Sequence, residues 1–287
     1  MKNLVVYKAN QVIEASYKLT LNEQRVVLAC VGQVYSKEAL LITDEFELSA
    51  KDFSELFSVS DKRAYLSLIE VAESLFHRYV VVDNPYPEKP RVKQLKMRWL
   101  SSIKYLTDDG KIILRFSQDM LPYLSELKGT FTRYELKHVG NMTSIYGIRL
   151  YELLMQWRST GKREIEIDWL KKQFQIEQLY PEMCDLKKRV IDPAVSDINT
   201  HSNYNVSWTQ RKTGRRVTHL TFTFTEKKPV VELPVKNKAV KAVKTEIAVK
   251  EDMMLGITKS EIEKQARLGE TYPQAALRIM RENLKRG

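Results

Sequence analysis

The stretch PEMCDLKKRVIDPAVSDINTHSNYNVSWTQRKTGRRVTHLTFTFT, residues 181–225, decides the fold. Pro181 suits the first position of a helix, and the apolar residues that follow share one helical face: Met183, Leu186, Val190 and Ala194. Two alternating strands come next, Tyr204–Gln210 and Val217–Thr225. A helix followed by such a hairpin is the end of a winged helix, in which the second helix of a helix-turn-helix reads DNA beside a β-hairpin wing.

The outer side of this helix is basic. Lys188 and Arg189 lie opposite the apolar face and Lys187 lies at its border, whereas Pro193 should end or kink the helix. The turn of the hairpin adds four further cations: Arg211, Lys212, Arg215 and Arg216. We therefore predict that the segment contacts DNA bases and phosphates. A solvated charged face is the alternative, and for the helix alone it is the commoner case.

The same order of elements is found earlier in the chain. Thr20 caps a first helix, with Glu23 three residues later as in a capping box. The predicted elements after it are a strand at Phe46–Leu48, a helix capped by Ser49, a helix over 61–76, a strand at Tyr79–Asp83, a hairpin of Lys96–Leu106 and Lys111–Phe116, and a short helix capped by Ser117.

The second half of the chain repeats this order of elements. Thr143 is predicted to cap a helix reaching Trp157, Glu164–Ile167 is a short strand, and Asp168 caps the helix after it. The pattern indicates an internal duplication. We predict an α+β protein of two tandem winged-helix domains, residues 1–128 and 129–225, followed by a basic linker at 226–250 and a short helical, flexible tail at 251–287.

The first half gives a weaker signal for DNA. Lys62 and Arg63 begin its second helix and are candidate phosphate or base contacts. Acidic residues of the same helix, Asp61, Glu70 and Glu73, dilute this charge. A solvated surface is equally compatible with the pattern, and the first domain could instead serve in dimerisation.

Composition agrees with a polyanionic partner. The 287 residues carry 47 Lys and Arg against 36 Asp and Glu, a net charge of +11. Two distant cysteines, Cys30 and Cys184, fit a reducing cytoplasm, and no apolar run is long enough to span a membrane.

Catalytic motifs are not found. The four histidines show no metal-binding spacing, no phosphate-binding glycine loop is present, and we expect neither an enzyme nor a cofactor or metal.

Four motifs together resemble the iteron-binding replication initiators of theta-type plasmids: Leu19–Arg25, Ile148–Leu154, Leu186–Val195 with Asp197–Asn199, and Thr213–Leu220. The resemblance covers roughly residues 5–225. It implies two winged-helix domains, with the main groove contacts from Lys187, Lys188 and Arg189 and wing contacts from Arg215 and Arg216. It also implies monomers that bind direct repeats at the origin, open the duplex and recruit the host replication initiator and replicative helicase. Dimers joined through the first domain would repress the initiator's own gene.

Two other functions use the same features. A winged-helix repressor would read an inverted repeat as an obligate dimer. A rolling-circle nickase would need a tyrosine nucleophile beside a bound metal. We expect the initiator, and DNA flanking the gene would discriminate it from a repressor.

Overall fold

The computed structural model describes residues 4–34, 39–58, 64–86, 88–125 and 131–227, together with 253–254, 257–258, 278–279 and 282 near the C-terminus. The chain divides into two compact units, Met1–Pro229 and Val230–Gly287. In the second unit, the described residues include a minimal antiparallel pair, β11 (Met253–Met254) and β12 (Ile257–Thr258). The linker expected at 226–250, apart from Glu226 and Lys227, and the helix expected from Ser260 lie outside the described residues.

The first unit contains two winged-helix domains, as predicted. Each has a three-stranded antiparallel sheet of the same topology, in which the third strand lies between the first and the second. The first sheet has the order β2-β6-β5, made of Phe46–Ser49, Lys111–Phe116 and Leu100–Leu106. The second has the order β8-β10-β9, made of Lys162–Glu166, Arg216–Glu226 and Tyr204–Thr213. The shared topology supports the internal duplication that the sequence pattern indicates.

The helices of the first domain pack on one core. Thr20 begins α2 (Leu21–Val31) with the predicted capping box, and Ser49 accepts the Asp52 amide to begin α3 (Ala50–Phe57). The apolar side of α4 (Ala64–Phe76) contributes Leu68, Ala72 and Leu75 to the core.

The hairpin predicted at residue 96 is shorter than expected. The chain leaves β4 (Gln94–Arg98) at Trp99 and enters β5 at Leu100. β4 pairs with β3 (Tyr79–Asp83) in a separate two-stranded ribbon. Trp99 is fully buried, so the strand breaks where its side chain enters the core. Ser117 does not cap the next segment, the 3₁₀ helix η2 (Gln118–Tyr123), because its hydroxyl donates to the Arg98 carbonyl at 2.6 Å.

Two predicted caps of the second half are wrong by one or two residues. Ser144, not Thr143, caps α6 (Ile145–Met155): its hydroxyl accepts the Gly147 amide, whereas the Thr143 hydroxyl donates to the buried Asp197 carboxylate at 3.2 Å. The helix α7 (Ile167–Phe174) begins before Asp168, which lies in its first turn. Glu166 occupies the N-cap position without a side-chain bond.

Residues 183–201 form one helix with an unusual middle. It runs as α8 (Met183–Leu186), the π-helical segment η3 (Lys187–Ile191) and α9 (Asp192–His201). Pro193 neither ends the helix nor contributes an amide, and the Asp192 amide bonds five residues back to the Lys187 carbonyl. The helix therefore accommodates the proline, which has no amide hydrogen, by one wide π turn and does not break there.

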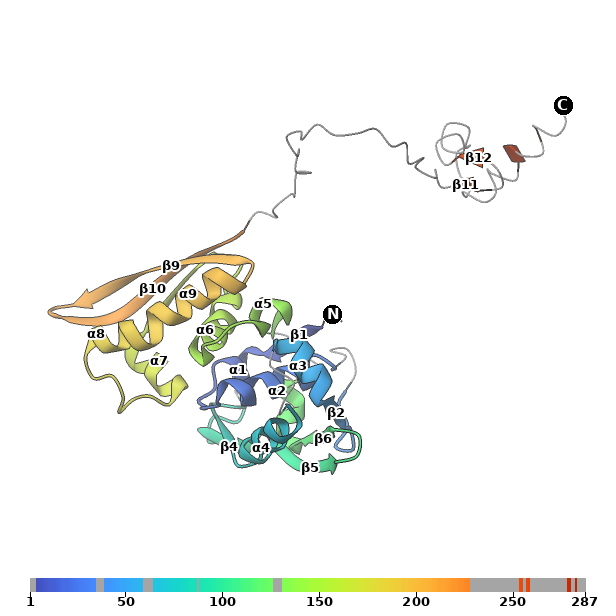
Figure 1. Ribbon diagram of the computed structural model, residues 1–287. Helices are drawn as coiled ribbons and strands as arrows, with labels where there is room; N and C mark the ends of the chain where they lie inside the picture. Colours follow the sequence, from blue (N-terminus) through green and yellow to red (C-terminus); the bar gives the residue numbers. More distant parts are fainter. Residues whose placement is uncertain are drawn as a thin grey trace. The chain divides into compact units, whose positions relative to one another are not determined.

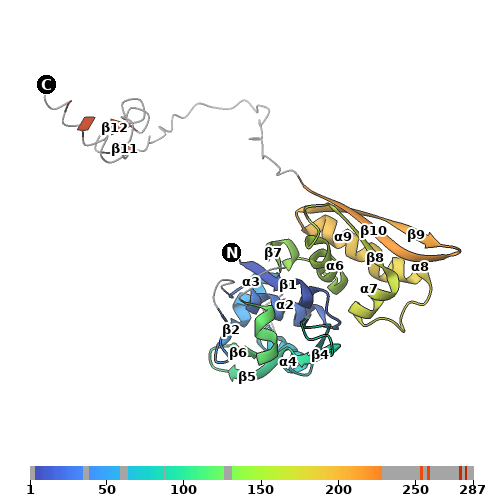
Figure 2. The same cartoon turned by 180° about the vertical axis from the view of Figure 1, so that it is seen from behind.

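Two strands that the sequence pattern did not predict join the start of the first unit to its middle. β1 (Val5–Ala9) pairs with β7 (Phe131–Glu135) in register Val5 to Glu135. The short helices α1 (Asn10–Ile13) and α5 (Lys137–Gly140) flank this pair in the chain, and α5 also contacts α9. Figure 2 shows β1 and β7 side by side near α6.

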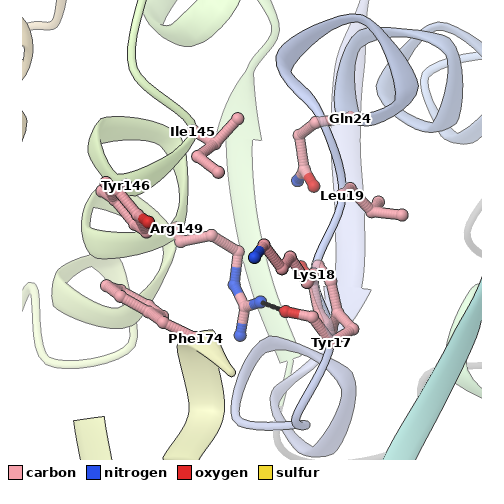
Figure 3. A pocket seen from close by; sticks show the side chains of 8 residues that line it. All are labelled: Tyr17, Lys18, Leu19, Gln24, Ile145, Tyr146, Arg149 and Phe174. Atoms are coloured by element: carbon pink, nitrogen blue, oxygen red, sulfur yellow. Dashed lines mark hydrogen bonds between the residues drawn. The ribbon is translucent and has the colours of Figure 1, made fainter. Parts of the chain in front are cut away.

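Helix α6 is the joint between the two halves. One side packs on α9, and the other presents two buried charges, Arg149 and Glu152, to the N-terminal segment. Arg149 donates to the carbonyl of Tyr17 at 3.0 Å (Figure 3) and to that of Ala15 at 2.8 Å. Lys8 reaches Glu152 at 2.7 Å, and both side chains are fully buried. Because Lys8, Ala15 and Tyr17 all belong to the N-terminal segment, these contacts fix α6 to the start of the chain.

Candidate nucleic-acid interface

The predicted DNA contacts of the second domain fall on two adjacent surfaces. Helix 183–201 lies along the ribbon of β9 and β10, and the turn of that ribbon extends past α8 (Figures 1 and 2). The apolar side of the helix is buried, as predicted, through Leu186, Val190 and Ala194, together with Ile191. Its exposed side carries Lys187, Lys188 and Arg189, all within η3, which we call the basic triplet.

The basic triplet is anchored to the ribbon by one aromatic residue. The Lys187 ammonium lies 5.7 Å from the ring centroid of Trp208 on β9. The indole nitrogen of Trp208 donates to Asp192 at 3.3 Å, at the start of α9. Arg189 is 4.0 Å from Asp185 one turn earlier, and Lys188 has no ion-pair partner among the residues described. The helix and the strand therefore hold a fixed register to each other through Trp208.

The ribbon is longer than the sequence pattern predicted. Its strands extend to Thr213 and Arg216, so the turn proper consists of Gly214 and Arg215. Gly214 has φ +63°, a left-handed conformation that favours glycine at this tight turn. Arg211 and Lys212 consequently lie in β9 rather than in the turn, although both remain exposed.

The four wing cations differ in their partners. Arg211 donates two hydrogen bonds to Glu164 on β8, and Arg216 donates to both carboxylate oxygens of Asp168. We call Arg211 and Arg216 the held arginines. Lys212 and Arg215 have no ionic or hydrogen-bonding partner within the described part of the chain, and we call them the free cations. The hydrogen bond from Arg211 holds the pKa of the exposed Glu164 carboxyl below its usual range.

Lys62 and Arg63, the candidates of the first domain, lie outside the described residues. The described part of their helix has a different outer face from that of the basic triplet. Its most exposed positions are Leu66, Glu70 and Glu73, with His77 directly after the helix, and we call these four the α4 stripe. Glu73 accepts a hydrogen bond from the Tyr105 hydroxyl on β5.

Sequence analysis missed three residues that shape this interface: Glu164, Asp168 and Trp208. Glu164 was visible only as an outward position of an alternating strand. Its pairing depends on β10 lying between β8 and β9, so that Arg211 reaches across the central strand. A one-dimensional pattern does not contain that neighbour relation.

Neither a metal-binding cluster nor a membrane-spanning helix is found among the described residues. No group of three or more His, Cys, Asp or Glu is placed to hold a metal ion among them. Within the same residues, no helix has the length and apolar character needed to cross a membrane.

Relatives of known sequence include two from Escherichia coli. A replication initiation protein is 31% identical over 210 residues, an alignment that covers 71% of this chain and 64% of the relative. The chain therefore spans less than two thirds of that relative's length. A protein named PI protein is 25% identical over 253 residues, covering 78% of this chain and 83% of the relative.

A solved structure shares the fold. The crystal structure of Pi initiator protein in complex with iteron DNA superposes with a TM-score of 0.68 at 22% identity, covering 79% of this chain and 99% of that one. Two family descriptions match consecutive parts of the sequence: "Initiator Replication protein, WH1" over residues 5–155, and "Initiator Rep protein, WH2" over residues 166–224. Since the first match alone spans more than half of the chain, this protein belongs to the family of initiator replication proteins with tandem WH1 and WH2 domains.

Proposed function

We propose that this protein initiates plasmid replication by binding direct repeats, the iterons, at the origin. One observation carries the proposal: the basic triplet stands on a half-buried helix beside a wing that carries the two free cations. A helix of this kind can place Lys188 and Arg189 against base edges while the wing contacts the backbone. The iteron complex of the structural neighbour supports the same use of the fold.

The proposal assigns no catalysis to the chain. Binding by monomers would help to open the adjacent AT-rich duplex and recruit the host replication initiator and replicative helicase in the cytoplasm. Dimers formed through the first domain would be inactive in replication and repress the protein's own gene. Lys62 and Arg63 are proposed as auxiliary contacts of the first domain, and the domain limits 1–128 and 129–225 remain a prediction.

Binding to repeat DNA tests the role of the basic triplet. We expect the double variant Lys188→Ala and Arg189→Ala to weaken binding to a duplex with tandem repeats from the gene's flanking DNA by about 100-fold, because a good base contact contributes about 1–3 kcal/mol. Fluorescence anisotropy against a scrambled duplex measures the loss. The matched control removes two exposed lysines elsewhere, Lys51→Ala and Lys137→Ala. Full repeat-specific affinity in the first variant would refute the assignment.

Strand opening separates an initiator from a repressor. With supercoiled plasmid carrying the repeats, we expect permanganate-reactive thymines in the AT-rich stretch next to the occupied repeats. Footprints on the repeats without any reactive thymine, even after addition of the host initiator, would favour the repressor. A nick covalently attached to a tyrosine would overturn the absence of catalysis.

A further inference from the structure

Two of the four wing cations are already bound to carboxylates of their own domain. The Arg211 guanidinium donates from Nε and Nη2 to the two oxygens of Glu164 at 3.0 and 2.9 Å. Thr221 on the central strand β10 donates to the same carboxylate at 3.2 Å and lies directly opposite Glu164 in the sheet. Glu164 is therefore fixed on the outer face of the sheet, across β10 from the arginine.

The second ion pair joins Arg216 to Asp168, an acid that comes from a helix and not from a strand. Asp168 lies in the first turn of α7, and Arg216 is the first residue of β10 after the turn of the ribbon. Arg216 Nη2 contacts the two carboxylate oxygens at 3.1 and 3.3 Å. A helix and a strand thus each supply one acid, and together these acids hold one arginine on either side of the ribbon's turn.

These carboxylates occupy the donors that DNA would use. A guanidinium offers its forked N–H groups to a carboxylate in the same two-oxygen geometry as to a phosphate. All four side chains are substantially exposed, between 42% and 74%, so the pairs are not needed to neutralise a buried charge. A held arginine that turned to DNA would also leave a bare carboxylate close to the phosphates.

We propose that Glu164 and Asp168 are positioning residues that withhold the held arginines from DNA, leaving the two free cations as the phosphate contacts of the wing. This inference rests on the proposed DNA-binding function and sharpens it. The two acids determine how many wing cations contact the phosphates of any duplex, irrespective of its sequence. They therefore lower sequence-independent affinity, to which phosphate contacts contribute most.

The salt dependence of binding counts these contacts. The slope of log affinity against log salt changes by about 0.9 for each phosphate contact on duplex DNA. We expect the isosteric double variant Glu164→Gln and Asp168→Asn to steepen the slope by about 1.8 and to raise affinity roughly tenfold at 0.1 M salt. Adding Arg211→Ala and Arg216→Ala to that variant should return the slope to its original value.

Two comparisons separate phosphate contacts of the wing cations from a general effect of net charge. In the otherwise unchanged protein, Lys212→Ala with Arg215→Ala should flatten the slope by about 1.8, whereas Arg211→Ala with Arg216→Ala should change it by less than about 0.5. The matched charge control is Glu166→Gln with Glu177→Gln. Both glutamates are exposed and, among the described residues, neither has an arginine partner.

The inference is overturned if removing the held arginines flattens the slope as much as removing the free cations does. It is also overturned if the charge control steepens the slope as much as the isosteric variant. Should Asp168→Asn lower the thermal midpoint, Glu164→Gln alone tests one contact, with an expected change of about 0.9. All slopes are measured on a repeat duplex and on a scrambled one. Equal affinity for both duplexes would overturn the proposed function, while the slopes on the scrambled duplex would still decide this inference.

Discussion

The second helix of each winged-helix domain presents a different outer face, although the two domains share one sheet topology. The α4 stripe is acidic and apolar, and Leu66 within it is 61% exposed. The basic triplet lies on the corresponding helix of the second domain, where Asp185 and Asp192 flank three consecutive cations. A phosphate backbone would be repelled by Glu70 and Glu73 but attracted to the triplet.

This difference shows that a duplicated fold need not duplicate its chemistry. The apolar side of each helix is constrained by the hydrophobic core, in which Leu68 and Val190 are both fully buried. The outer side is under no such constraint. The second domain is therefore expected to provide the main contacts with DNA, and the described part of α4 is expected to lie away from phosphates.

Reversing the charge of the basic triplet is expected to have the largest effect. Lys188→Glu with Arg189→Glu should weaken repeat binding by about 1000-fold or more, since like charges against phosphate cost several kcal/mol. Both side chains are exposed, so the thermal midpoint should stay within about 2 °C. Anisotropy and calorimetry measure the two quantities. A loss below tenfold would remove the contrast between the two helices.

The buried ion pair between Lys8 and Glu152 is expected to stabilise the whole first unit. Lys8→Met leaves the Glu152 carboxylate buried without its cation, and we expect a loss of about 3–5 kcal/mol in the free energy of unfolding. Adding Glu152→Gln should recover part of it. Lys51→Met is the control, because its pair with Glu55 is fully exposed at 4.0 Å. Urea unfolding that shows no greater loss for Lys8→Met than for the control would mean that the joint does not stabilise the unit.

Replacing Trp208 tests whether the contact between the second domain's ribbon and its helix matters for DNA binding. Trp208→Leu takes away the ring near Lys187 and the bond to Asp192, and we expect roughly three- to fivefold weaker repeat binding. Trp157→Leu, at another exposed tryptophan, should leave affinity unchanged. Identical anisotropy titrations for both variants would show that the basic triplet needs no anchor.

Neutralising the α4 stripe is expected to have the smallest effect. Glu70→Ala with Glu73→Ala should raise DNA affinity less than threefold at 0.05 M salt and not at all at 0.2 M, since screening removes distant repulsion. The same anisotropy assay at two salt concentrations is sufficient. A rise above tenfold would place the stripe against the phosphate backbone and make the two helices functional equivalents.

Most helices and strands could be predicted from local sequence signals. The capping box at Thr20, the Ser49 cap and the alternating strands were readable because each depends on residues close in sequence. Pairings between distant segments were not readable. Asp197, 54 residues away, binds the hydroxyl of Thr143, and β1 finds its partner 126 residues later at β7. The site divides in the same way: the exposure of the basic triplet follows from helical periodicity, whereas the pairing of Arg211 follows from strand order.

The wide turn at Lys187–Ile191 has a consequence for sequence comparison. A π turn accommodates one more residue than an α turn at the same place, so the helix is in effect one residue longer between Leu186 and Asp192 than its α-helical equivalent. An alignment with a relative whose helix is α throughout therefore requires a one-residue gap inside the basic triplet or just after it. Without that gap, every residue from Met183 to the triplet would be matched to a position about 100° away around the helix axis.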